Sequence, residues 1–220
     1  MSNIQNTIQK IKSDIPKTVT LVAVSKTKPN EAIMAAYYTG QRVFGENKAQ
    51  ELVRKHEDLP KDIEWHLIGH LQTNKVKYIA PFVSLIHAVD SLKLLKEINK
   101  QGTKYNRIIP CLLQVKIAEE ESKFGLSMEN AKAILNDPEI KTMKNVSIVG
   151  LMGMATFTDN EEQIKTEFKS LKTFFDQLKT NHPALHTLSM GMSDDYQLAI
   201  EQGSNMIRIG STIFGKRSYN

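Results

Sequence analysis

Short runs of β-branched and other apolar residues alternate with helical patterns along the whole chain. Eight such runs are readable, at residues 19–25, 42–45, 65–68, 84–88, 108–115, 146–152, 186–189 and 206–209. This alternation is typical of βα units around a parallel sheet. In 220 residues, eight units predict a single α/β domain over 1–220 that forms a (β/α)₈ barrel with an extra N-terminal helix. An open, doubly wound sheet is the structural alternative.

Several helix starts are also readable. Thr158 and Glu161 have the spacing of a capping box, and the helical pattern that follows is the clearest in the chain. Ser91 and Ser127 each precede a helical pattern, and a further helix is expected to start near Ser193.

Composition excludes several classes of protein. The 29 Lys and Arg against 24 Asp and Glu give a net charge of +5, but the lysines are scattered singly among acids and are interpreted as solvated helix faces. No apolar run is long enough for a signal peptide or a membrane span. The single cysteine, Cys111, excludes an intramolecular disulfide and is predicted to be a small buried hydrophobe. We therefore expect a cytoplasmic protein that binds neither nucleic acid nor membrane.

Functional groups of both candidate folds lie at the C-terminal ends of the strands. Lys26 follows the first run and is the first candidate. Partial burial disfavours the ammonium form of a lysine, and the free amine can then attack an aldehyde. The alternative is that Lys26 ends the strand in solvent, as we expect for Lys28.

Two glycine-containing stretches near the C-terminus, LSMGMSDD and RIGSTIFG, predict a phosphate cradle. Ser189 ends the seventh run, and Gly210 and Ser211 open a turn after Arg208. Glycine lets the backbone approach a ligand, and backbone N–H groups and hydroxyls supply donors. In barrels of this class, phosphate sites commonly use the loops after the last two strands.

Other interpretations of these two stretches remain open. Ser193 fits a helix N-cap followed by Asp194 and Asp195, whose carboxylates would repel a phosphate. Ser189 and the turn at Gly210 are therefore the preferred phosphate ligands. Arg208 also fits an ion pair inside the barrel mouth.

The second and third runs bring further polar residues to the same rim. Asn47 can donate to a ligand oxygen, whereas Glu46 is expected to start a helix. His66 and His70 lie four residues apart, about 13 Å on an extended segment, so no metal site is expected. His66 is expected to point into packing and His70 to lie near a ligand. Lys123 after the fifth run is a second ligand-facing amine or a surface lysine.

Seven motifs together resemble the pyridoxal-phosphate homeostasis protein family, which is related to the barrel domain of alanine racemase. They are VAVSKTKP, FGEN, WHLIGHLQTNK, SKFGL, GLMGMA, LSMGMSDD and IRIGSTIFGKR, and the resemblance extends over residues 21–217. It implies a barrel that carries pyridoxal 5′-phosphate as a Schiff base on Lys26. It also implies contacts of Ser189, Gly210 and Ser211 with the phosphate, of Arg208 with the pyridine nitrogen, and of Asn47 near the ring.

The resemblance also implies a non-catalytic role. Pyridoxal-phosphate enzymes often place an Asp beside the pyridine nitrogen, and an always-cationic arginine there weakens the electron sink. Racemisation needs acid/base groups on both faces of the substrate. Alanine racemase takes its second base from an additional domain, whereas this chain ends at Asn220 after its eighth unit.

We therefore expect a monomer that holds and delivers pyridoxal phosphate. Other B6 vitamers and pyridoxal-phosphate-dependent apoenzymes are its further expected partners. A low-rate amino-acid racemase is the alternative. A Schiff-base aldolase that uses Lys26 without a cofactor and a nucleic-acid-binding protein are more distant alternatives.

Overall fold

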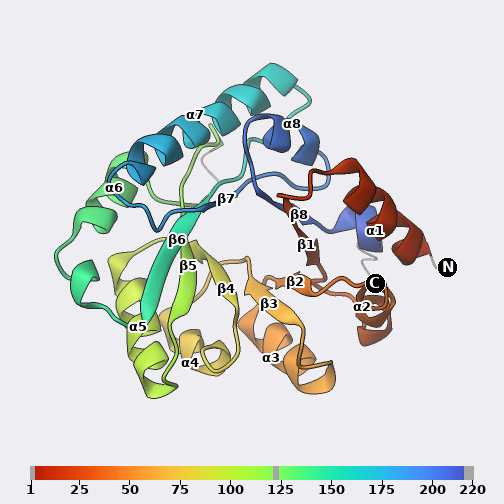
Figure 1. Ribbon diagram of the computed structural model, residues 1–220, viewed down its shortest axis with the longest axis horizontal. Coiled ribbons are helices and arrows are strands. Elements are labelled where there is room, and N and C mark those ends of the chain that lie inside the picture. The colour runs from red at the N-terminus through yellow and green to blue at the C-terminus, as the bar shows by residue number, and fades with distance from the viewer. Residues whose placement is uncertain (1–2, 121–123, 216–220) are drawn as a thin grey trace.

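Eight parallel strands form a closed barrel in chain order, with β8 pairing back onto β1 (Figure 1). The computed structural model describes residues 3–120 and 124–215, so Lys123 and the end of the IRIGSTIFGKR motif lie outside the described residues. The strands are β1 (Thr20–Val24), β2 (Val43–Glu46), β3 (Glu64–Leu67), β4 (Leu85–Val89), β5 (Ile109–Gln114), β6 (Val146–Met152), β7 (Thr187–Ser189) and β8 (Met206–Ile209). This closure confirms the predicted (β/α)₈ barrel and excludes the open sheet.

Helices surround the barrel on its outer side (Figure 1). They are α1 (Asn3–Asp14), α2 (Asn30–Tyr37), α3 (Ala49–Asp58), α4 (Val76–Ile79), α5 (Leu92–Lys104), α6 (Met128–Asn136), α7 (Glu161–Lys179), α8 (Tyr196–Glu201) and α9 (Ser211–Phe214), with 3₁₀ turns η1 (Thr73–Lys75) and η2 (Ile140–Thr142). The extra helix expected at the N-terminus is α1, which packs beside α2 and α9.

Two of the expected helix caps are confirmed and two are wrong. Ser91 and Ser127 accept hydrogen bonds from the third residue after each of them, as N-caps do. The N-cap of α7 is Asn160 rather than Thr158, because the Asn160 side chain accepts a hydrogen bond from the backbone N–H of Gln163. Ser193 caps no helix, since α8 begins only at Tyr196.

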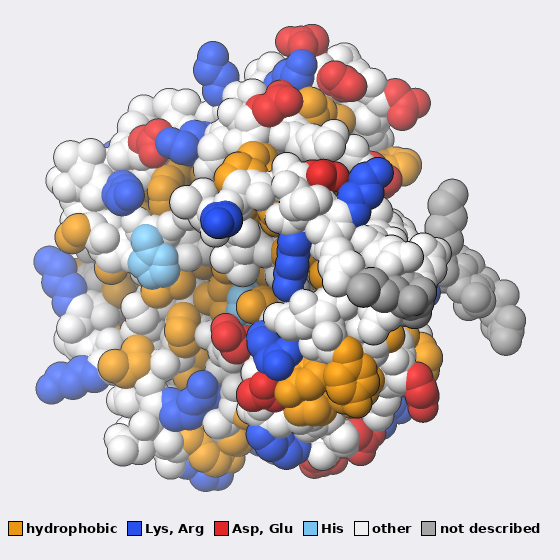
Figure 2. All heavy atoms as spheres, turned by 45° about the vertical axis from the view of Figure 1, so that its right-hand side comes forward, with side chains coloured by type: hydrophobic (Ala, Val, Ile, Leu, Met, Phe, Trp, Pro, Cys, Tyr) orange, Lys and Arg blue, Asp and Glu red, His pale blue; other side chains and the backbone are white. Residues whose placement is uncertain are grey.

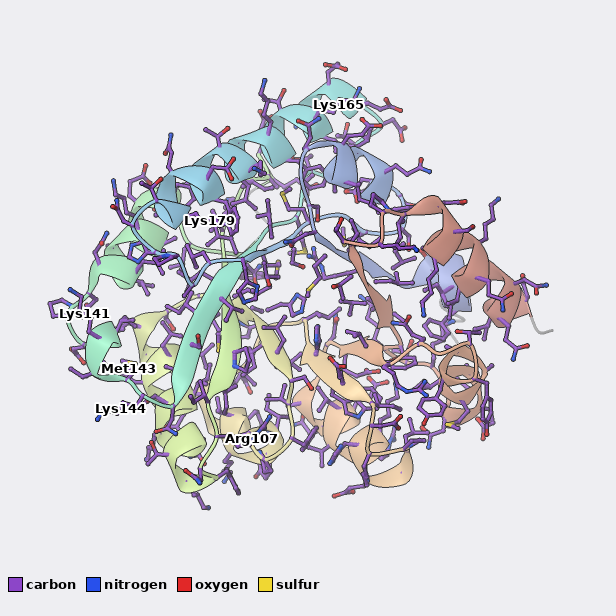
Figure 3. The ribbon with its side chains drawn as sticks, viewed as in Figure 1. Arg107, Lys141, Met143, Lys144, Lys165 and Lys179 are labelled. Atoms are coloured by element: carbon purple, nitrogen blue, oxygen red, sulfur yellow. The ribbon has the colours of Figure 1, made fainter. Side chains whose placement is uncertain are left out.

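Two apolar cores fill the structure. The larger lies between the barrel and its helices and includes Phe44, Trp65 and Phe168. The smaller lies inside the barrel and is formed by Val22, Leu85, Ala88, Leu112, Met152 and Met206. At the N-terminal ends of the strands, Arg107, which precedes β5, donates to the carbonyls of Ala80 and Val83 in the connection before β4 (Figure 3).

Charged side chains of both signs reach the face drawn in Figure 2. Lys141 and Lys144 are exposed at the outer margin of the molecule, away from the barrel centre (Figure 3). Cys111 is fully buried in β5, as expected for a small hydrophobe. Within the described ranges, no helix combines the length and the apolar character that a membrane crossing requires.

Candidate functional site

A cavity of about 660 Å³ opens at the C-terminal ends of the strands. That volume lies within the usual range of small-molecule sites. Its walls come from seven of the eight βα units: Val24, Lys26, Lys28, Asn47, Ile68, Gly69, His70, Gln114, Phe124, Met154, Phe157, Met192, Ser193, Asp194, Arg208, Gly210, Ser211 and Gly215. Five of the six predicted site residues are therefore brought together in one cavity. The sixth, Ser189, is not among its lining residues.

Lys26 and Asn47 enter the cavity from the ends of neighbouring strands. β1 and β2 are paired, with Val24 opposite Gly45, so the segments that follow them lie side by side. Glu46 ends β2 fully buried and does not start α3, which begins at Ala49. The expectation that Glu46 starts a helix is wrong, because its carboxylate turns outward from the barrel to meet Lys55, 2.8 Å away.

Arg208 lies at the base of the cavity with only 4% of its surface exposed. Its Nη1 donates to the carbonyl and hydroxyl oxygens of Ser189 at 2.9 and 2.6 Å, and its Nη2 donates to the Gly153 carbonyl at 3.0 Å. Burial lowers the pKa of Arg208 to about 10, against the effect of the Asp195 carboxylate, so the side chain stays cationic at neutral pH. Among the described residues, the hydrogen-bond partners of Arg208 are neutral oxygens and not the carboxylate of an ion pair.

A chain of buried polar side chains continues from Ser189 across the barrel interior. The Ser189 hydroxyl lies 3.2 Å from Nδ1 of His87, and Nε2 of His87 lies 3.0 Å from Nδ1 of His66. Burial lowers the pKa of His66 to about 3 and that of His87 well below its usual range. Both rings are neutral at physiological pH, so only one of the two facing nitrogens carries a proton. His66 thus packs inside the barrel, as expected.

Hydroxyl and backbone N–H groups meet at another corner of the cavity. The Ser193 hydroxyl accepts from the backbone N–H of Gly210 at 3.2 Å and of Thr212 at 3.4 Å. Gly210 packs closely on β1, since a Cβ there would lie 3.2 Å from Val24 atoms. Ser211 lines the same corner. The N–H groups of Gly210 and Thr212 are thus directed to the Ser193 oxygen, and the hydroxyls of Ser193 and Ser211 are the groups that can donate to an anion here. The Asp194 carboxylate also reaches the cavity.

Sequence reasoning does not select Ser193 or His87 as residues of the site. Ser193 was assigned to a helix cap, and only the contact between the loops after β7 and β8 shows that its hydroxyl faces the cavity. His87 lies in an apolar run, and no local signal shows that it contacts Ser189 from across the barrel. His70, the other predicted rim histidine, lines the cavity 3.3 Å from the Asp90 carboxylate. The described part of the chain contains no cluster of three or more side chains suited to a metal ion.

A closed (β/α)₈ barrel with an amine, a buried guanidinium and a hydroxyl-lined corner in one cavity defines a barrel protein with a lysine-bearing candidate ligand site. The family described as "Alanine racemase, N-terminal domain" matches residues 1–218. The pyridoxal phosphate homeostasis protein of Aquifex aeolicus is 41% identical over 201 residues, which cover 90% of this chain and 87% of that protein. The protein of that name from Vibrio alginolyticus is 40% identical, with all of both chains covered.

Two solved structures are also similar to this chain. PipY of Synechococcus elongatus with PLP bound has a TM-score of 0.87 and 35% identity, covering 96% of this chain and 100% of that one. Alanine racemase of Clostridium difficile has a TM-score of 0.83 at 13% identity, a likeness that shows the fold alone. The chain belongs to the pyridoxal phosphate homeostasis protein family.

Proposed function

We propose that this chain binds pyridoxal 5′-phosphate in the cavity, holds it as a Schiff base on Lys26 and takes part in intracellular homeostasis of the cofactor. The observation that carries the proposal is that Lys26 and Arg208 line the same cavity as the donor-rich corner of Ser193, Gly210 and Ser211. The relative PipY, solved with PLP bound, supports the same ligand.

The donor set fits the two ends of this cofactor. We assign the phosphate to the corner formed by Ser193, Ser211 and the backbone of Gly210. The two hydroxyls would donate to it, and the Gly210 N–H, which donates to the Ser193 oxygen here, would turn to the phosphate when it binds. Arg208 and Asn47 are assigned to the ring. Ser189, predicted as a phosphate ligand, is assigned to holding Arg208, because its hydroxyl is buried against that guanidinium.

The charge of Arg208 favours holding the cofactor over using it in catalysis. When bound, the cofactor supplies an aldehyde that condenses with a lysine amine with loss of water, and a ring that accepts electrons best when its nitrogen is protonated. A guanidinium has five N–H donors, of which Arg208 uses three on Ser189 and Gly153. Such a cation donates to an unprotonated nitrogen and disfavours its protonation. We therefore propose a carrier role.

Several sequence-based expectations stay part of the proposal. They are a single domain over 1–220, a monomeric state, a cytoplasmic location, delivery of the cofactor to apoenzymes and binding of other B6 vitamers. Light scattering after gel filtration tests the monomer. Mixing the loaded protein with a pyridoxal-phosphate-dependent apoenzyme tests delivery.

The absorption spectrum of the purified protein tests the central assignment. We expect a visible band that disappears on borohydride reduction, with the added mass mapped to Lys26. The Lys26→Ala protein should lack both the band and the modification. A reducible band retained by Lys26→Ala would contradict the assignment.

A low-rate amino-acid racemase is the second candidate, favoured by the match to the alanine racemase N-terminal domain over residues 1–218. Chiral analysis of alanine and serine incubated with the loaded protein distinguishes the two. Racemisation by the wild-type protein that is lost in Lys26→Ala would establish the racemase. Equal, background inversion in both proteins would support the carrier.

A further inference from the structure

A buried ionic cluster lies behind the segment that carries Lys26, between the barrel and α3. The Lys55 side chain is 1% exposed and that of Glu46 is fully buried. Nζ of Lys55 lies 2.8 Å from Oε1 of Glu46, 2.8 Å from Oε1 of Glu51 and 2.8 Å from the carbonyl oxygen of Ser25. An ammonium group has three N–H donors, so Lys55 can direct one donor to each partner.

The cluster holds the chain on both sides of Lys26. Before Lys26, the Ser25 hydroxyl donates to Oε1 of Glu46 at 2.6 Å, while the Ser25 carbonyl accepts from Lys55. After Lys26, the backbone N–H of Thr27 donates to Oε1 of Glu51 at 2.7 Å. Thr27 has a φ of 64°, a left-handed conformation that is unfavourable for a β-branched residue. The two anchors therefore maintain a backbone path that Thr27 would not otherwise favour.

We propose that Lys55 is a positioning residue, which together with Glu46 and Glu51 fixes the backbone around Lys26 so that the Lys26 amine is directed into the cavity. This inference rests on the proposed function only in that the Lys26 amine is taken to bind pyridoxal phosphate. Burying two charges carries a desolvation cost that an apolar pair of similar volume avoids. Here the two buried charges bond directly to Ser25. Lys55 also holds Glu51, whose carboxylate accepts from the Thr27 N–H, and an apolar pair could not make these bonds.

The alternative is that the cluster only stabilises the packing of α3. The double variant Lys55→Met/Glu46→Leu separates the two roles, because it removes both fully buried charges together. The Glu51 carboxylate, which reaches solvent, loses its cation but stays in place as the acceptor of the Thr27 N–H. The single variant Lys55→Met leaves the Glu46 carboxylate buried and is expected to be less stable than the double variant. Arg54→Met, at an exposed position of the same helix, is the matched control.

Three quantities are measured on each protein: stability to urea, exchange of the Thr27 amide hydrogen without ligand, and the dissociation constant for pyridoxal phosphate from the visible band. We expect the double variant to recover most of the stability lost by Lys55→Met. We also expect it to exchange the Thr27 amide faster than the wild type and to bind about tenfold or more weakly, because small displacements of a reacting group are costly. Arg54→Met should match the wild type in all three.

Glu51→Ala isolates the second anchor. Glu51 keeps 14% of its side-chain surface exposed, so its removal costs less stability than loss of Lys55, and it removes the acceptor of the Thr27 N–H. We expect faster Thr27 exchange and weaker binding, whereas Glu57→Ala, at an exposed position of the same helix, should change neither.

Recovery of both stability and wild-type affinity in the double variant would overturn the positioning role. Thr27 exchange unchanged in Glu51→Ala and in the double variant would overturn the anchoring itself. Failure of the proposed function is distinguishable, because it would appear as a wild-type protein with no Lys26-dependent band. Comparison of Thr27 amide exchange between the variants needs no ligand, so it would still test whether Glu51 and Lys55 hold the backbone beside Lys26.

Discussion

The Ser189 hydroxyl lies 2.6 Å from Nη1 of Arg208, below the cavity and out of contact with solvent. Ser189 also contacts His87, so its hydroxyl links the guanidinium to the histidine pair inside the barrel. The serine that lines the cavity is Ser193, four residues further along the chain. On the proposed assignment, the two serines act at different ends of a bound cofactor.

This difference predicts how the two serines affect ligands with and without a phosphate. Ser193→Ala should weaken binding of pyridoxal 5′-phosphate by about tenfold, since a hydrogen bond to a charged group is worth about 1.5–3 kcal/mol, and should leave pyridoxal binding unchanged. Ser189→Ala should weaken both ligands to a similar degree, because it loosens Arg208. Absorbance titrations with the two aldehydes measure this. A phosphate-selective loss in Ser189→Ala would return Ser189 to the phosphate site.

The buried histidines predict a loss of stability in acid. Burial lowers the folded-state pKa of His66 to about 3, whereas the unfolded chain titrates near 6.5, so between these values the unfolded state binds more protons. The free energy of unfolding should therefore fall as the pH drops below about 6.5, by up to about 1.4 kcal/mol per pH unit for one such histidine.

His66→Gln should make this pH dependence shallower, because Gln does not titrate and can still hydrogen-bond to His87. Urea unfolding between pH 7 and pH 4.5 measures the slopes. His186→Gln, at an exposed position, is the control and should keep the wild-type slope. Equal slopes for His66→Gln and the wild type would show that His66 is not the titrating group.

The barrel was predictable because its signal is local and repeated. Each of the eight runs agrees with an observed strand to within one residue at either end. Alternation of strands and helices needs no knowledge of distant contacts, and a closed parallel barrel is one of the few ways to bury both faces of such strands. The carboxyl ends of the strands then show where Lys26, Asn47 and Arg208 gather.

Side-chain partners across the barrel were not predictable in the same way. His87 and Ser189 are 102 residues apart in the chain, and Lys55 and Ser25 are 30 apart. Whether a strand residue faces the barrel interior or the helices depends on register and on irregularities such as the shift between β4 and β5. Ser189 does face the barrel interior, but its depth there depends on its pairing with Met206 of β8, and its hydroxyl contacts Arg208 below the cavity.

The buried thiol gives a probe of folding and ligand binding. Cys111 is fully buried, and burial raises the pKa of its thiol, so little reactive thiolate forms in the folded protein. A thiol reagent should label Cys111 only as the chain unfolds, with one equivalent taken up in denaturant. Pyridoxal phosphate should slow the labelling further, because a ligand of the folded state lowers the unfolded population. Rapid labelling of the folded protein would contradict this burial.

Gly69 is predicted to control the position of Asn47. A Cβ built on Gly69 would lie 2.5 Å from the Asn47 carbonyl oxygen and 2.9 Å from its Cα, both backbone atoms that cannot rotate away. Gly69→Ala should therefore displace Asn47 and weaken binding of pyridoxal phosphate by about tenfold, since both residues line the cavity. Gly150→Ala is the comparison, because its Cβ would overlap the Thr187 backbone between β6 and β7 and should lower stability without moving Asn47. If Gly69→Ala folds and binds with wild-type affinity, the Asn47 backbone does not need this close approach.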